Sequence, residues 1–169
     1  KSTWLFTILP MWAAAYGYVG FLTAFSVRAD QAQRHLETFK QELLNNELLK
    51  QDFPELCTAK YDPIQHRAVA WNATKIHQQN GFIFYATGID YTNLGLKEGT
   101  QRPDLLLCDD IEPGEKNYSG NGVRNTIGTV LDDIAPMNLQ ARLLVVGTTT
   151  MPNSMLDQFR QYAEGARTP

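Results

Sequence analysis

The sequence predicts an α/β domain with a mostly parallel sheet flanked by helices. Continuous apolar runs at residues 19–25, 105–108 and 143–146 have the length of buried strands and alternate with segments of helical periodicity. Acidic or threonine-rich residues follow two of these runs, at the strand ends where parallel sheets bind ligands. The 169 residues are enough for a single domain with a sizeable core, so we treat 1–169 as one unit.

The first half of the chain predicts two helices around one strand. Residues 3–15 favour a helix, which Pro10 can either kink or divide, and residues 19–25 follow as a buried strand. The clearest helix comes next, with Asp30 and Gln33 as a capping box near its start. Its apolar residues recur at spacings of four, three and four: Ala32, Leu36, Phe39 and Leu43.

The second half alternates strands, loops and helices. In chain order we expect strands at 67–71 and 82–87 joined through 72–81, a loop at 88–99, a strand at 105–108, a loop at 113–122, a helix at 123–134, a strand at 143–146 and a helix at 156–163.

Composition limits the classes of function. A net charge of −3 argues against a protein that coats nucleic acid by bulk charge, although a motor with few local contacts remains compatible. Cys57 and Cys108 are isolated, which indicates reduced thiols in a cytoplasmic protein rather than a zinc site, with a disulfide as the alternative.

The uncharged stretch at residues 2–27 is long enough to cross a bilayer. Pro10 and the turn-like segment at 16–20 instead favour a buried helix followed by a buried strand. The uncharged stretch alone supports the alternative, a membrane-anchored α/β domain.

Two short segments carry residues suited to phosphate chemistry. LLLCDDIE at 105–112 is an apolar strand ending in carboxylates, where one can hold Mg²⁺ and a neighbour can orient a water. The alternative is a solvated acidic turn. Lys1, Ser2 and Thr3 match the last part of the phosphate-binding motif G-x-x-x-x-G-K-[ST] without its glycines, and their alternative is an exposed terminus.

In their order and spacing these segments resemble the ATPase domain of terminase large subunits, the motors of tailed phages and related viruses. The matching segments are KSTWLF, FLTAFSVRADQA, NNELLKQDFP, GLKEGTQRPDLLLCDDIE and LLVVGTTT, which together span nearly the whole chain. The resemblance implies a P-loop NTPase-type sheet that is incomplete at its N-terminal edge. It also implies a partial domain, because the glycine loop and the downstream nuclease domain would lie outside 1–169.

The resemblance implies a role for each matching residue around ATP and Mg²⁺. Lys1 would neutralise the β- and γ-phosphates, with Ser2 and Thr3 beside it in the ATP site. Ser2 and Asp109 would hold Mg²⁺.

The attacking water would be oriented by a carboxylate after Asp109, and both Asp110 and Glu112 are candidates. Side-chain alternation in a continuing strand would send both to the same side. Gly147, Thr148, Thr149 and Thr150 would form the coupling motif that senses the γ-phosphate; the alternative is a loop whose threonines cap the following backbone.

The implied function is ATP hydrolysis that drives double-stranded viral DNA into a capsid, in the cytoplasm of an infected or lysogenic bacterial cell. The implied partners are DNA, the portal protein, the small terminase subunit and further copies in a homo-oligomeric ring, without a membrane. The alternative is another P-loop nucleic-acid motor of helicase type. Lys60, Arg67 and Lys75 could contact DNA phosphates or lie on an inert surface, and Arg102 could stabilise charge or be structural.

Overall fold

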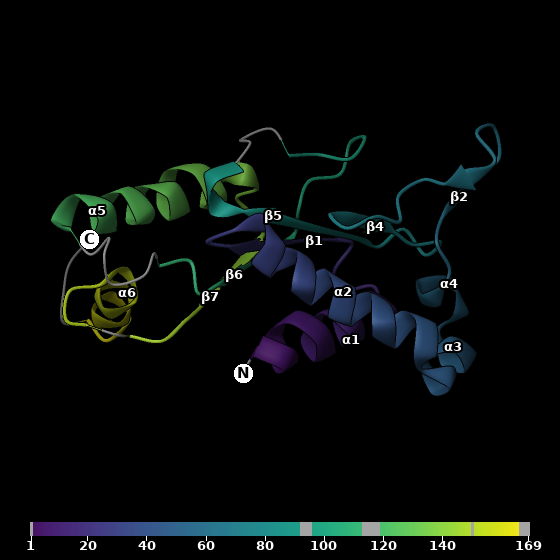
Figure 1. Cartoon of the computed structure of the whole chain (residues 1–169), viewed down its shortest axis with the longest axis horizontal. Helices are drawn as coiled ribbons and strands as arrows, with labels where there is room; N and C mark the ends of the chain where they lie inside the picture. The colour runs from purple at the N-terminus through teal and green to yellow at the C-terminus, as the bar shows by residue number, and fades with distance from the viewer. Residues whose placement is uncertain (1, 92–95, 113–118, 150, 166–169) are drawn as a thin grey trace.

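The computed structural model describes residues 2–91, 96–112, 119–149 and 151–165 (Figure 1). Within these ranges five strands form one sheet in the order β4-β5-β1-β6-β7, with β4 antiparallel and the other four parallel. The strands are β1 (Phe21–Ser26), β4 (Lys75–His77), β5 (Ile83–Gly88), β6 (Leu105–Asp109) and β7 (Arg142–Val146). The predicted fold class, a mostly parallel sheet flanked by helices, is confirmed.

One face of the sheet is covered by the N-terminal helix and by α2 (Ala29–Asn45), as Figure 1 shows. The N-terminal helix passes through η1 (Trp4–Ile8), a π-helical segment, into α1 (Leu9–Ala15). Pro10 lacks the N–H that an α-helix would use at this position, and the wider π turn precedes it, where the Leu9 N–H reaches the Trp4 carbonyl. The helix therefore continues through Pro10.

The predicted core stripe of α2 is confirmed. Its four apolar residues are all fully buried: Ala32, Leu36, Phe39 and Leu43. The predicted capping box is wrong, because α2 begins at Ala29 and the Gln31 side chain accepts a hydrogen bond from the Arg28 N–H at 3.3 Å. Asp30 instead forms an ion pair with Arg28 at 2.8 Å.

The other face is covered by a second set of helices, and a separate apolar cluster lies beneath them. They are α5 (Gly120–Gly128), η4 (Thr129–Ile134), η5 (Ala135–Met137) and α6 (Met155–Ala163). Alternation along β6 divides its side chains between the faces: Leu105 and Leu107 join the first cluster, and Leu106 and Cys108 the second. Asp109, two residues after Leu107, therefore shares the face of α2.

The predictions were least accurate between α2 and β5. Short helices α3 (Glu47–Asp52) and α4 (Pro54–Cys57) lead to a hairpin of β2 (Tyr61–Asp62) and β3 (Arg67–Ala68), separate from the main sheet. The strand predicted at 67–71 is thus mostly wrong. Strand β4 lies within the stretch predicted as a connection, because three residues are too few to show a periodicity. Of the predicted loop at 88–99, Gly88 ends β5, the 3₁₀ turn η2 (Ile89–Tyr91) follows, and 92–95 lie outside the described residues.

Among the described residues, every helix is too short or too polar to span a bilayer. The uncharged stretch at 2–27 is instead divided between the N-terminal helix and β1, and its Phe6, Leu22 and Phe25 are fully buried.

We expect Phe39→Ala to lower the free energy of unfolding by about 3–5 kcal/mol, the usual cost of removing a buried aromatic ring. Phe39 is fully buried and contacts the rings of Phe82 and Phe84. The matched control is Leu48→Ala in α3, where the side chain is 74% exposed. Urea denaturation of both variants gives the comparison, and equal losses would contradict the assigned core.

Candidate functional site

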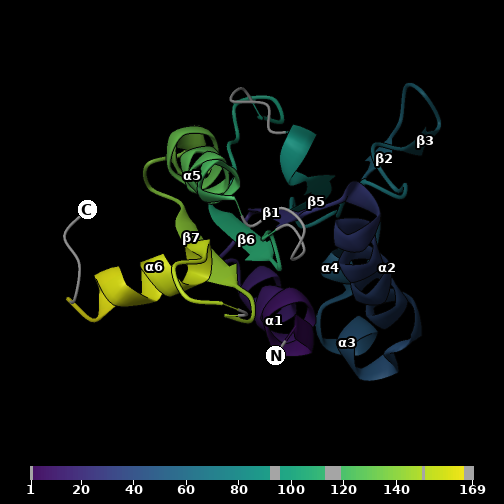
Figure 2. The same ribbon diagram turned by 60° about the vertical axis from the view of Figure 1, so that its left-hand side comes forward.

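The candidate site lies at the carboxyl end of β6, which Figure 2 shows ending close to the N-terminal helix. Asp109 is the last residue of β6, and only 8% of it is exposed. Its neighbours in the sheet are Ser26 at the end of β1 and Val146 at the end of β7. A nearly buried carboxylate needs hydrogen-bond donors or a cation, so the atoms around Asp109 decide what the site can do.

Ser2 and Asp109, the two residues predicted to hold Mg²⁺, come together although 107 positions separate them. The Ser2 hydroxyl lies 3.5 Å from Asp109 Oδ1, at the upper limit of a hydrogen bond. Ser2 is the first described residue of the N-terminal helix. Thr3 follows as an exposed residue, and Lys1 lies outside the described residues.

His35, which the sequence interpretation missed, contacts the second oxygen of the same carboxylate. Its Nε2 lies 2.8 Å from Asp109 Oδ2, and its ring stacks on Phe6 with centroids 4.2 Å apart. The signal was present in the sequence: His35 lies three residues after Ala32 and four before Phe39, on the buried side of α2. Both oxygens of Asp109 therefore have partners from different elements.

Ser26 adds a polar atom to this end of the sheet. Its Cα pairs with that of Asp109 across β1 and β6, so the two side chains lie on the same face. Ser26 is 2% exposed, and its hydroxyl has no hydrogen-bond partner among the described residues. A buried polar atom of this kind usually bonds to a water or a ligand, which fits a site that binds something polar beside Asp109.

Asp110 leaves the strand instead of continuing it. It has φ +44°, in the left-handed region, and its N–H bonds to the Val146 carbonyl at 2.9 Å. The predicted alternation that would send Asp110 and Glu112 to the same side is wrong, because the regular strand ends at Asp109. Asp110 is exposed and lies against Gly147: a Cβ there would be 3.3 Å from Asp110 Oδ1.

Glu112 points to a different element. Its Oε1 accepts a hydrogen bond from the Leu156 N–H at 3.2 Å, in the first turn of α6. A carboxylate at this position satisfies a free helix N–H and interacts favourably with the helix dipole. Glu112 therefore has a structural role at the start of α6.

The predicted coupling residues follow β7 directly. Gly147 packs closely against α6, because a Cβ at this position would overlap Leu156 Cδ1 and that side chain would have to shift. Thr148 and Thr149 are exposed, and Thr150 lies outside the described residues. The segment begins beside Asp110, which bonds to the Val146 carbonyl and lies against Gly147.

Both cysteines are free thiols. Burial raises the pKa of Cys108 to about 12, and it also raises the pKa of Cys57. Each thiol is therefore protonated at neutral pH and is a poor metal ligand. Within the described ranges no three His, Cys, Asp or Glu residues are grouped to hold a metal ion.

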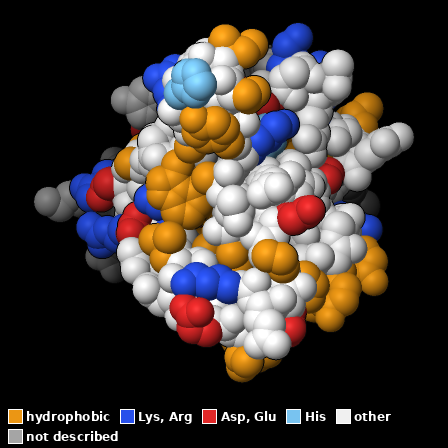
Figure 3. All heavy atoms as spheres, turned by 90° about the vertical axis from the view of Figure 1, so that its right-hand side faces the viewer, with side chains coloured by type: hydrophobic (Ala, Val, Ile, Leu, Met, Phe, Trp, Pro, Cys, Tyr) orange, Lys and Arg blue, Asp and Glu red, His pale blue; other side chains and the backbone are white. Residues whose placement is uncertain are grey.

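Three of the basic residues that could contact DNA or stabilise charge bond to neighbouring protein groups. Lys75 forms an ion pair with Glu98 at 2.8 Å, and Arg102 donates to the Met137 carbonyl at 3.0 Å, which supports the structural interpretation of Arg102. Arg67 bonds to Gln65 on the β2–β3 hairpin. On the face shown in Figure 3, Lys and Arg side chains are interspersed with acidic and apolar ones. This face has no continuous basic surface for DNA.

No protein-family model and no curated protein matches this chain. The geometry at the end of β6 is therefore the observation on which a functional proposal must rest.

For Glu112 we expect a stability effect that depends on its oxygen. Glu112→Ala removes both the acceptor for the Leu156 N–H and the charge, and it should lower the free energy of unfolding by about 1.3–2 kcal/mol. Glu112→Gln keeps an acceptor oxygen and should lose less, about 0.3–1 kcal/mol from the helix-dipole interaction. Thermal unfolding of both variants measures this difference, and a wild-type melting temperature for Glu112→Ala would disprove the capping role.

Proposed function

We propose that this chain is the ATPase part of a viral DNA-packaging motor of the terminase large-subunit type. The observation that carries the proposal is the approach of Ser2 to Asp109 at 3.5 Å. One residue opens a helix and the other ends a buried strand, which is the arrangement that a phosphate-binding loop and its acidic strand require.

The residues around Asp109 suit Mg²⁺ bound together with a nucleotide. Mg²⁺ prefers oxygen ligands and, in nucleotide sites, takes only one or two from the protein, with water and phosphates supplying the others. Ser2 supplies a hydroxyl, Asp109 a carboxylate and Ser26 an unpaired buried hydroxyl nearby. When bound, Mg²⁺ would neutralise charge on the β- and γ-phosphates.

The helix that Ser2 opens adds to phosphate binding. A phosphate at the start of a helix is favoured by the backbone N–H groups and by the positive end of the helix dipole. Lys1, the residue before Ser2, would contribute the positive charge that neutralises the β- and γ-phosphates, as the resemblance implies.

Asp110 is our candidate for orienting the attacking water. Its left-handed backbone turns it out of the strand directly after Asp109, and it is exposed. A non-glycine residue held in this region often marks a functional site, although Asp tolerates it better than most. Glu112, the competing candidate, is engaged by the first turn of α6.

The residues proposed for coupling lie where a change at Asp110 would reach them. Asp110 bonds to the backbone of Val146 and packs against Gly147, the residue before Thr148. A shift of the Asp110 turn would thus move the start of the 147–149 segment.

The described sheet has an open edge at β7. Strand β7 pairs only with β6 among the described strands, and four of its five residues are partly exposed. An apolar cavity of ≈ 350 Å³ lies beside it, lined by Leu9, Trp12, Ala13, Tyr18, Val19, Leu105, Arg142 and Leu144.

Packaging of DNA, with a portal protein, a small terminase subunit and a ring of copies as partners, follows from the resemblance of the GLKEGTQRPDLLLCDDIE segment. A helicase-type motor would use the same nucleotide site. Assays for capsid filling and for strand separation by the full-length protein distinguish the two functions.

In the full-length protein we expect Lys1→Ala and Asp109→Ala each to reduce ATP hydrolysis by at least about 100-fold, because each removes a group that stabilises charge in the transition state. Asp132→Ala removes an exposed carboxylate from η4 and serves as the control. Steady-state phosphate release measures turnover. Near-normal rates in either site variant would refute the proposed nucleotide site.

Replacing Thr148 and Thr149 by Val should reduce DNA packaging more than ATP hydrolysis. The hydroxyls would be lost while the size of each side chain is kept, so chemistry would continue without driving movement. The comparison is DNA length packaged per ATP consumed. If this ratio stays at the wild-type value, the two threonines have no coupling role.

A further inference from the structure

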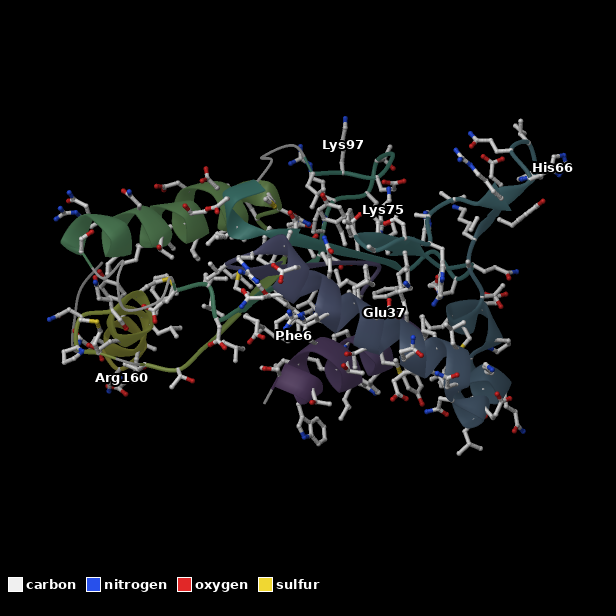
Figure 4. All side chains as sticks on the ribbon, viewed as in Figure 1. Phe6, Glu37, His66, Lys75, Lys97 and Arg160 are labelled. Carbon is white, nitrogen blue, oxygen red and sulfur yellow. The ribbon has the colours of Figure 1, made fainter. Side chains whose placement is uncertain are left out.

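The contact between His35 and Asp109 joins three elements at one point. His35 belongs to α2, Asp109 to β6, and Phe6, which stacks on the histidine ring, to the segment η1 that follows Ser2. Figure 4 labels Phe6 between the N-terminal helix and α2. The side chains of His35 and Asp109 are 21% and 11% exposed, so little water competes for the bond between them.

The direction of this hydrogen bond follows from the chemistry of the two groups. An ionised carboxylate has no hydrogen to donate, so Nε2 of His35 carries the hydrogen and donates it to Oδ2. The stacked Phe6 ring lies at 19° to the imidazole, which fixes the plane in which that N–H points.

This hydrogen bond determines which way the carboxylate faces. The terminal torsion of an aspartate has a broad preference, so the carboxylate can rotate unless a partner holds it. With Oδ2 held by His35 at 2.8 Å, Oδ1 faces Ser2 at 3.5 Å. A partner of this kind on a metal-binding carboxylate typically changes metal affinity or activity by about 10–100-fold.

We propose that His35 is a positioning residue for the cation site, holding the Asp109 carboxylate so that Oδ1 stays directed toward Ser2. The inference rests on the proposed function, because it assigns Ser2 and Asp109 to the cation of a bound nucleotide. His35 touches neither nucleotide nor cation and acts only through Asp109.

The test compares ADP binding with and without Mg²⁺ in the full-length protein, by titration calorimetry in Mg²⁺ and in EDTA. His35→Phe keeps an aromatic ring against Phe6 but removes the donor. His35→Gln places an amide N–H at about the reach of Nε2, whereas His35→Asn is shorter. Thr38→Val on the same helix is the control, since the Thr38 hydroxyl is exposed and donates to the Arg34 carbonyl of its own helix.

We expect His35→Phe to lose about 10-fold or more of the affinity that Mg²⁺ adds to ADP, with the affinity in EDTA unchanged. His35→Gln should recover most of that gain, His35→Asn little of it, and Thr38→Val should match the wild type. A merely structural role would lower both affinities together and would show no rescue by Gln.

The outcomes separate this inference from the proposed function. If Mg²⁺ strengthens ADP binding in the wild type, Asp109→Ala abolishes that gain and His35→Phe leaves it intact, the positioning role is wrong and the site stands. If Mg²⁺ adds nothing in the wild type, or Asp109→Ala retains the gain, both proposals fail.

Discussion

The site is organised by the cost of burying a carboxylate. Asp109 is 8% exposed at the end of a strand whose other residues are all buried, so its charge must be met by donors or by a cation. Ser2 meets one oxygen and His35 the other. Because these partners come from the N-terminal helix and from α2, this one group links both helices to the end of β6, beside the apolar core that packs them on the sheet.

The acidic residues at the end of β6 and just after it have different roles, because the backbone places their carboxylates in different surroundings. Asp109 stays in the sheet, paired in register with Ser26 and Val146. Asp110 turns out of it with a positive φ, and Glu112 reaches α6. Asp109 thus lies at the candidate cation site, Asp110 lies in an exposed turn, and Glu112 caps the start of a helix. All three side chains are carboxylates, and only their backbone positions distinguish them.

Much of the framework was predictable because local pattern and burial agree. The apolar run before Asp109 is β6, the stripe on α2 is the core, and the motif at Ser2 pointed to the residue that meets Asp109. His35 was not predicted because no motif links it to Asp109, although its spacing places it on the buried side of α2. The turn at Asp110 was not predicted either, since Asp can adopt a left-handed backbone or remain in a strand. Strand β4 is too short to show a periodicity.

The most direct measurement is a crystal structure of the full-length protein with Mn²⁺ and a non-hydrolysable ATP analogue, in which anomalous scattering locates the metal. We expect the Mn²⁺ beside Ser2 Oγ, bound by Asp109 directly or through one water, with the nucleotide phosphates at the start of the N-terminal helix. The contradicting result would be metal and nucleotide elsewhere with Ser2 and Asp109 bonded only to each other. One such place is the groove between α5 and α6, which Arg124 and Asn153 help to line.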